Sequence, residues 1–164
     1  MLLGLSLAAF TALHTGISLI GIAAGVIFFA GLLGGRWLGG VNTLFLVFTI
    51  LTSVTGFMFP PKPIGPPFLF GVVSLLLLAV ALYALYGRKL GGRLRAVYLL
   101  TALAAQYLNM VVLVVQSYQK IPPLQAIAPT GAEPAVLATQ AVVLLAVLFT
   151  GWRVLRPARA ALEH

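Results

Sequence analysis

From Met1 to Gly35 the chain contains no lysine, arginine, aspartate or glutamate, and similar uncharged runs recur towards its C-terminal end. Charged residues make up only 7% of the sequence and hydrophobic residues 62%, whereas soluble domains carry roughly 25% charged residues. So few charges cannot cover a surface that faces water. The pattern predicts an all-α integral membrane protein.

Five segments are long and apolar enough to form membrane-spanning helices, since a helix needs about 20 residues to cross the hydrocarbon core. We expect a five-helix transmembrane bundle built as a single domain from residues 1–161. The first span is the longest, which indicates either a tilted helix or one that begins at the membrane interface. Leu162-Glu163-His164 matches the start of a common expression tag, so residues 162–164 are set apart from functional reasoning. The predicted spans are 5–33, 38–59, 68–86, 96–118 and 135–155.

Basic residues are distributed unevenly over the segments that connect the spans. With five spans, the segments after the first, third and fifth lie on one side of the membrane and hold all lysines and arginines except Lys62 and Lys120. The positive-inside rule therefore predicts an outside N-terminus and a cytoplasmic C-terminus. Because orientation in the membrane already accounts for this basic charge, we do not expect a nucleic-acid partner. Anionic lipid headgroups are expected to contact the basic residues of loop 87–95, which are Arg88, Lys89, Arg93 and Arg95.

Polar side chains inside the spans follow helical spacing. Gln106, Asn109 and Gln116 share one face of the fourth span, and His14 shares a face of the first span with several small residues. In the predicted orientation these groups lie mainly in the outer half, whereas the inner half is nearly all leucine, valine and alanine. Two interpretations stay open: hydrogen bonds that hold helices together, or the lining of an outward-opening pocket. The pocket would be formed by His14, Ser18, Thr52, Asn109, Gln116 and Gln140.

The longest connection, residues 119–134, belongs to the outer side. Its apolar side chains could fold back as a lid over the bundle or settle among lipid headgroups. Thr130 and Glu133 fit a T-x-x-E capping box, and Pro134 suits the start of a helix. We expect Glu133 to cap this helix. An ion pair with Lys120 or His14 is the alternative.

The sequence lacks the residues that several kinds of chemistry require. The chain has no cysteine, and its few histidines and carboxylates cannot supply the three or four ligands of a metal site. Neither a phosphate-binding G-x-x-x-x-G-K-[ST] motif nor a G-x-S-x-G nucleophile motif is present. Enzymatic activity is therefore not favoured, and no cofactor is expected. Haem would have to use His14 with Met58 or Met110 as axial ligands.

Four stretches carry a resemblance to a family of small, uncharacterised bacterial inner-membrane proteins: LHTGISLI (13–20), SVTGFMFP (53–60), YLNMVVLVVQ (107–116) and AIAPTGAEP (126–134). The resemblance implies a multi-pass protein of the bacterial inner membrane and names no activity. Members of that family often carry a histidine where this chain has Phe68, so a second histidine for a haem or a proton relay is missing here.

The sequence favours a non-enzymatic membrane protein that binds, and could transport, a small neutral or weakly polar ligand in its outer half. One alternative is an accessory or assembly subunit of a larger membrane complex. Another is a haem- or quinone-binding redox protein that uses His14. A lone bundle of this size leaves little room for a transport pathway, so we expect a homo-oligomer.

Overall fold

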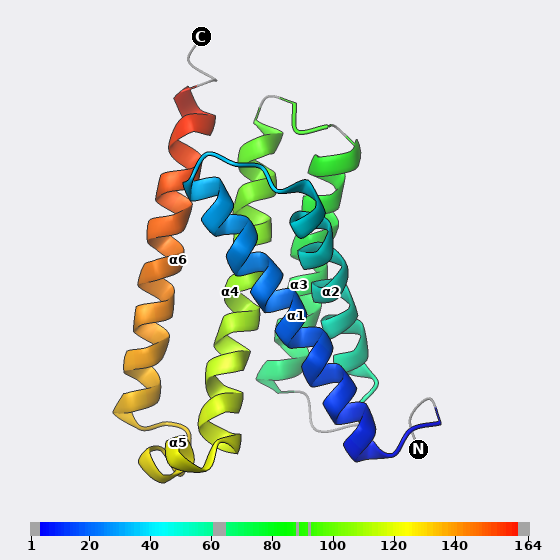
Figure 1. The fold of residues 1–164 in the computed structure, drawn as a ribbon, viewed down its shortest axis with the longest axis vertical. Helices are drawn as coiled ribbons and strands as arrows, with labels where there is room; N and C mark the ends of the chain where they lie inside the picture. The colour runs from blue at the N-terminus through cyan, green and yellow to red at the C-terminus, as the bar shows by residue number, and fades with distance from the viewer. Residues whose placement is uncertain (1–3, 61–64, 88, 92, 161–164) are drawn as a thin grey trace.

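The part of the chain that the structure describes contains five long helices and one short helix (Figure 1). The computed structural model describes residues 4–60, 65–87, 89–91 and 93–160. Each predicted span is confirmed as a helix, with ends within a few residues of those expected. The third helix continues into a π-helical turn at Tyr83–Gly87. The helices are α1 (Leu7–Leu33), α2 (Gly39–Phe57), α3 (Pro66–Leu82), α4 (Leu94–Lys120), α5 (Pro122–Ile127) and α6 (Pro134–Ala160).

The five long helices are each long and apolar enough to cross a membrane. Helix α1 begins after Ser6, whose hydroxyl accepts a hydrogen bond from the backbone N–H of Ala9 at 3.2 Å. Its 27 residues extend about 40 Å at 1.5 Å per residue, which exceeds the hydrocarbon thickness of about 30 Å. Figure 1 shows α1 running diagonally across the bundle. Helix α1 is thus inclined to the other long helices, while its tilt within a membrane stays a prediction.

Helix α4 is the centre of the bundle. It contacts α1, α2, α3, α5 and α6. All of its residues from 101 to 118 are buried or half-buried. Helix α6 is peripheral, because only 11% of its membrane-spanning window is buried. Of the polar side chains in the middle of α4, Gln106 is buried and Asn109 and Gln116 are half-buried.

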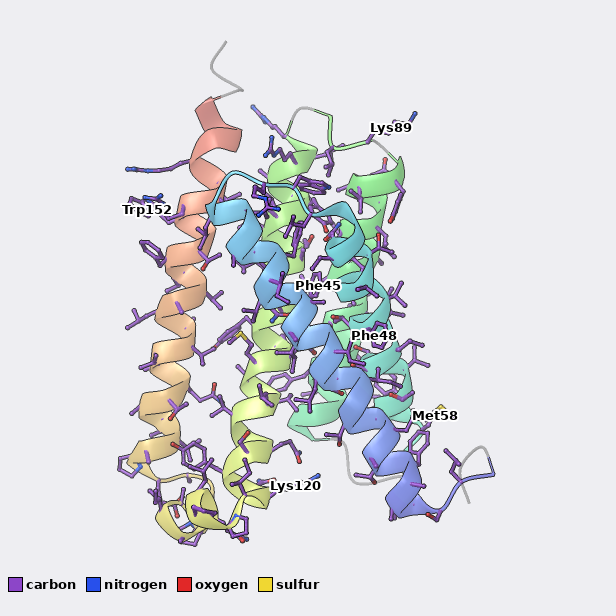
Figure 2. All side chains as sticks on the ribbon, viewed as in Figure 1. Phe45, Phe48, Met58, Lys89, Lys120 and Trp152 are labelled. Carbon is purple, nitrogen blue, oxygen red and sulfur yellow. The ribbon has the colours of Figure 1, made fainter. Side chains whose placement is uncertain are left out.

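The two ends of the bundle differ in charge. We call the end that carries Arg36, Lys89 and Arg153 the basic end. Lys89 and Trp152 lie there, whereas Lys120 and Met58 lie at the opposite end (Figure 2). The helices thus bring together the basic segments that the sequence assigned to one side of the membrane.

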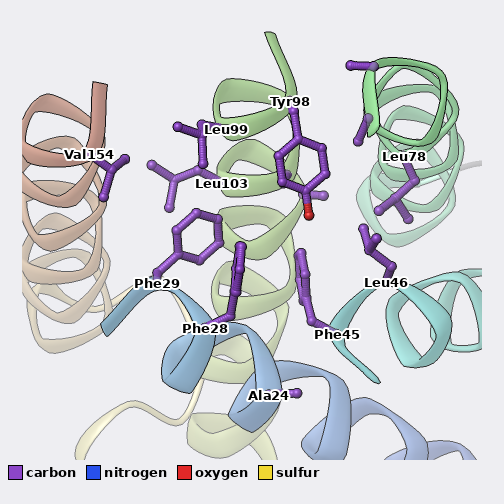
Figure 3. Packing of buried hydrophobic residues seen from close by; sticks show 14 of the residues in the cluster. Ala24, Phe28, Phe29, Phe45, Leu46, Leu78, Tyr98, Leu99, Leu103 and Val154 are labelled. Carbon is purple, nitrogen blue, oxygen red and sulfur yellow. The ribbon is translucent and has the colours of Figure 1, made fainter. Parts of the chain in front are cut away.

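The main hydrophobic core lies near the basic end, where aromatic and aliphatic side chains of α1, α2, α3, α4 and α6 pack together (Figure 3). It includes Phe28 and Phe45, and also a polar pair: the hydroxyl of Tyr98 donates to Oδ1 of Asn42, and both residues are buried. The expectation that this half is nearly all leucine, valine and alanine is therefore wrong. A polar pair is tolerated at this depth because donor and acceptor satisfy each other.

Helices α1 and α2 pack against each other in an antiparallel arrangement. Phe10 meets Phe59 at one end, and Phe29 meets Phe45 nearer the basic end. Between them, a Cβ at Gly21 would lie 3.3 Å from the backbone of Phe48 and Thr49. The glycine face of α1 therefore allows the two backbones to approach closely.

Candidate functional site

His14 lies half-buried between α1 and α2, near the end opposite the basic end. Its Nδ1 is 2.7 Å from the hydroxyl oxygen of Thr55 on α2. Its ring packs edge-on against Phe59, with ring centroids 5.2 Å apart and planes at 85°. Phe59 in turn packs edge-on against the fully buried Phe10, which holds its ring beside the imidazole.

The hydrogen bonds of Thr55 favour one tautomer of the histidine ring. The hydroxyl of Thr55 has one proton and donates it to the backbone carbonyl of Leu51 at 2.7 Å. In that arrangement the hydroxyl accepts from His14, and Nδ1 of the imidazole carries the hydrogen. In the neutral ring, Nε2 is then a hydrogen-bond acceptor. It makes no hydrogen bond with any residue that the structure describes.

The approach to the imidazole is kept open by a glycine. A Cβ placed on Gly56 would lie 3.7 Å from Cε1 of His14, the carbon next to Nε2. Gly56 itself is exposed. A larger residue here would cover this edge of the ring.

Ser18 and Thr52 lie one turn further along the same helix pair. Each hydroxyl donates to a carbonyl four residues back in its own helix, His14 for Ser18 and Phe48 for Thr52, both at 2.8 Å. The register of α1 against α2 places them at a similar depth. Both oxygens keep acceptor capacity but have no proton to offer, so this region can accept hydrogen bonds more readily than donate them.

Asn109 belongs to a separate junction, where α1, α2 and α4 meet. Its side-chain N–H donates to the hydroxyl of Thr49 on α2 at 3.4 Å. One turn away, Gln106 is 2% exposed and donates to the backbone carbonyl of Ile22 on α1 at 3.0 Å. These two amides link α4 to α2 and to α1.

Gln140 belongs to α6 and contacts a different face of α4. Its amide donates to the backbone carbonyl of Val111 at 3.0 Å and joins α6 to α4. Gln116 is half-buried on α4 and makes no hydrogen bond with the described residues. The predicted set of six therefore divides into an α1–α2 group around His14, the α4 residues Asn109 and Gln116, and an α4–α6 contact.

Sequence reasoning missed several residues of these sites. Thr55, Phe59 and Gly56 complete the surroundings of His14, and the only available signal was their place in one helical turn at the end of the second span. The predicted site also left out Ser74 and Gln106, and Oγ of Ser74 and Oε1 of Gln106 are among the buried side-chain oxygens that have no hydrogen-bond partner in the described part of the chain. Each is an acceptor in the interior of the bundle.

The connection between α4 and α6 folds into α5 and a turn. Ala128 is buried with Val114 and Val136, while Ile121 and Ile127 are exposed. Figure 1 shows α5 beneath α4 and α6, away from the start of α1. It covers the α4–α6 end and not the region around His14, so the predicted lid does not extend over the whole bundle.

Glu133 stabilises the turn before α6, but the predicted capping box is not formed at the start of the helix, because Thr130 lies four residues before Pro134. Its Oε1 accepts from the backbone N–H and from the hydroxyl of Thr130, both at 2.8 Å. These bonds, that of the Thr130 backbone first, lower the pKa of the Glu133 carboxyl from its usual value. Because α6 begins at Pro134, Glu133 stands directly before the helix and its carboxylate fixes the turn that leads into it.

The loop at the basic end exposes Lys89, Arg93 and Arg95. Arg88, the fourth residue expected to contact lipid headgroups, lies outside the described residues. So do residues 162–164, which were assigned to a tag. Within the described part of the chain, no three histidine, cysteine, aspartate or glutamate side chains gather to hold a metal ion.

Fold and composition together define the class to which this chain belongs: multi-pass helical membrane proteins. No protein-family model, curated protein sequence or solved structure matches the chain.

Proposed function

We propose that the protein binds a small, neutral or weakly polar ligand at the end of the bundle opposite the basic end, and that His14 is the residue that recognises it. The observation that supports this proposal is the pair of bonds at the Thr55 hydroxyl, to His14 and to the carbonyl of Leu51, which favours a hydrogen on Nδ1 and an acceptor at Nε2. The ligand would therefore carry an O–H or N–H donor.

The surroundings of His14 support an amphipathic ligand. Phe59 offers apolar ring surface beside the imidazole, while Gly56 leaves room at the ring edge. Binding pockets commonly combine apolar walls with a few placed polar groups. The basic asymmetry and the family resemblance support a bacterial inner membrane with His14 in the outer leaflet, which would receive ligands from outside.

An NMR titration tests the proposal. Protein labelled with ¹⁵N-histidine and ending at Ala161 has His14 as its only histidine. Phenol and its methyl ether anisole are matched probes, because both have an aromatic ring but only phenol can donate a hydrogen bond. We expect phenol to shift the Nε2 resonance saturably and anisole to leave it nearly unchanged. Equal responses to the two probes, or none, would refute the site.

A pair of threonine variants tests the hydrogen-bond assignment. Thr55→Val removes the acceptor of the Nδ1 hydrogen, so the ring should become a mixture of both neutral tautomers. Thr52→Val is the matched control, since its hydroxyl bonds to its own helix and its loss should leave the tautomer unchanged. Identical histidine spectra for both variants would contradict the assignment.

A second candidate function is that of an accessory subunit in a larger membrane complex. The amides of Gln106 and Gln140 favour it. Their N–H groups donate to backbone carbonyls of neighbouring helices, which is typical of side chains that hold helices together. Gentle extraction from native membranes separates the two candidates. A stoichiometric partner protein would support the subunit, whereas a protein that purifies alone and still responds to phenol would support the binder.

A further inference from the structure

The chain has two tryptophans, and both lie at the basic end: Figure 2 labels Trp152 there, and Trp37 packs against Tyr98 of the main hydrophobic core. Trp37 follows Arg36 in the connection between α1 and α2, and Trp152 lies near the end of α6 (Figure 2). Tryptophan rings concentrate at the boundary between hydrocarbon and headgroups. Trp152 therefore marks the depth at which α6 reaches the headgroup region.

Three side chains are stacked on the outward face of α6. The rings of Phe149 and Trp152 have centroids 6.0 Å apart, and the guanidinium carbon of Arg156 lies 4.1 Å from the centre of the Trp152 ring. Phe149 is 55% and Trp152 50% exposed. This stack faces away from the other helices and holds the cation of Arg156 just beyond the tryptophan.

The stacked guanidinium can still bind an anion. A guanidinium is planar, so contact of one face with an indole leaves its N–H donors pointing outward in the plane. Two of these donors match the oxygens of a phosphate group. Glu133, the one carboxylate among the described residues, lies at the opposite end of the bundle, so it cannot neutralise Arg156.

An apolar strip continues from the stack towards the middle of α6. Val142 and Leu145 are each 66% exposed and Leu148 58%. The strip follows the same outward face as Phe149, since the residues recur at three- and four-residue spacing. A phosphate group at Arg156 would thus have room for its own acyl chain directly beside it.

We infer that the outward face of α6 binds an anionic phospholipid, with the headgroup phosphate on Arg156 and an acyl chain along Phe149, Leu148 and Leu145. The charge of Arg156 and the adjoining apolar strip together match a lipid, whereas a free phosphate would use the cation alone. This site lies at the other end of the bundle from His14 and does not depend on the proposed function.

Fluorescence quenching tests the site in reconstituted protein. The Trp37→Phe variant leaves Trp152 as the only tryptophan. It is placed in phosphatidylcholine vesicles that contain equal fractions of either phosphatidylglycerol or phosphatidylcholine with brominated acyl chains, which quench tryptophan on contact. We expect brominated phosphatidylglycerol to associate about fivefold more strongly, the effect of one basic residue near an anionic headgroup. Should Trp37→Phe not fold, the difference between the wild type and Trp152→Phe gives the same signal.

Two arginine variants separate a defined site from a general attraction to the basic end. Arg156→Gln should abolish the preference for phosphatidylglycerol. Arg153→Gln removes the same charge from an exposed position in the same turn but leaves the stack intact, so the preference should persist. An equal loss in both variants, or no preference in the wild type, would overturn the proposal. Full reversal by inorganic phosphate at matched ionic strength would also overturn it, in favour of a free anion.

Discussion

Gly25 is the position where one added methyl group should have the largest effect on stability. A Cβ at Gly25 would lie 2.2 Å from Oε1 and 2.6 Å from Cδ of Gln106, and 2.9 Å from Cδ2 of Phe45. Both neighbours are buried, so the amide cannot swing into open space. To make room for Gly25→Ala, Gln106 must give up its bond to the carbonyl of Ile22.

Two effects lower the free energy of unfolding of the Gly25→Ala variant. An interhelical hydrogen bond in a membrane protein contributes about 0.6 kcal/mol on average and about 1.7 kcal/mol at most. Overpacking a well-packed interior costs about 1–3 kcal/mol. Gly25→Ala should therefore lower the free energy of unfolding by about 2–4 kcal/mol. In a Gln106→Ala background most of this cost should disappear, because the clashing amide and its hydrogen bond are already absent.

Reversible unfolding in mixed micelles of detergent and dodecyl sulfate, followed by circular dichroism, measures these free energies. Gly16→Ala is the matched control: it lies on the same helix, and a Cβ there would meet nothing within 4 Å. It reports the gain in helix propensity alone. If Gly25→Ala is as stable as Gly16→Ala, or if the Gly25→Ala and Gln106→Ala effects simply add, the described junction between α1 and α4 is wrong.

Three further predictions concern other parts of the chain. Tyr98→Phe removes the donor to the buried Asn42 and should lower the free energy of unfolding by about 1–3 kcal/mol; an unchanged unfolding curve would mean that the pair is not formed. For Glu133, bonds from Thr130 lower the carboxyl pKa from 4.5, so their stabilisation is present above pH 4.5 and is lost as the pH falls through the lowered pKa of the folded state. The melting temperature of the wild type should therefore fall on acidification relative to Glu133→Gln, and parallel curves for the two proteins would count against this role. For the topology, a reporter that is active only outside the cytoplasm should work when inserted in loop 119–134 and be silent after the C-terminus, and the reverse pattern would overturn the predicted orientation.

The sequence predicted the spans well because bilayer thickness sets their length and because proline and glycine mark their ends. It also identified the face of α1 that carries His14 and Gly25 as one that packs inside the protein. What it could not supply was the partner of each polar group. Gln106 and Gln140 bond to backbone carbonyls, which every residue has and no side-chain pattern reveals. The separation of Asn109 from His14 likewise depends on the order of the helices around α4.

The central place of α4 has a consequence for the order in which the chain is built. The α1–α2 hairpin leaves the ribosome first, and it carries Asn42 and Thr49, whose partners Tyr98 and Asn109 belong to α4. Until α4 enters the membrane these groups have no partner from that helix, and unpaired polar groups are costly in hydrocarbon. The hairpin should therefore stay beside the insertion machinery, in contact with protein or water, until translation delivers the helix that completes it.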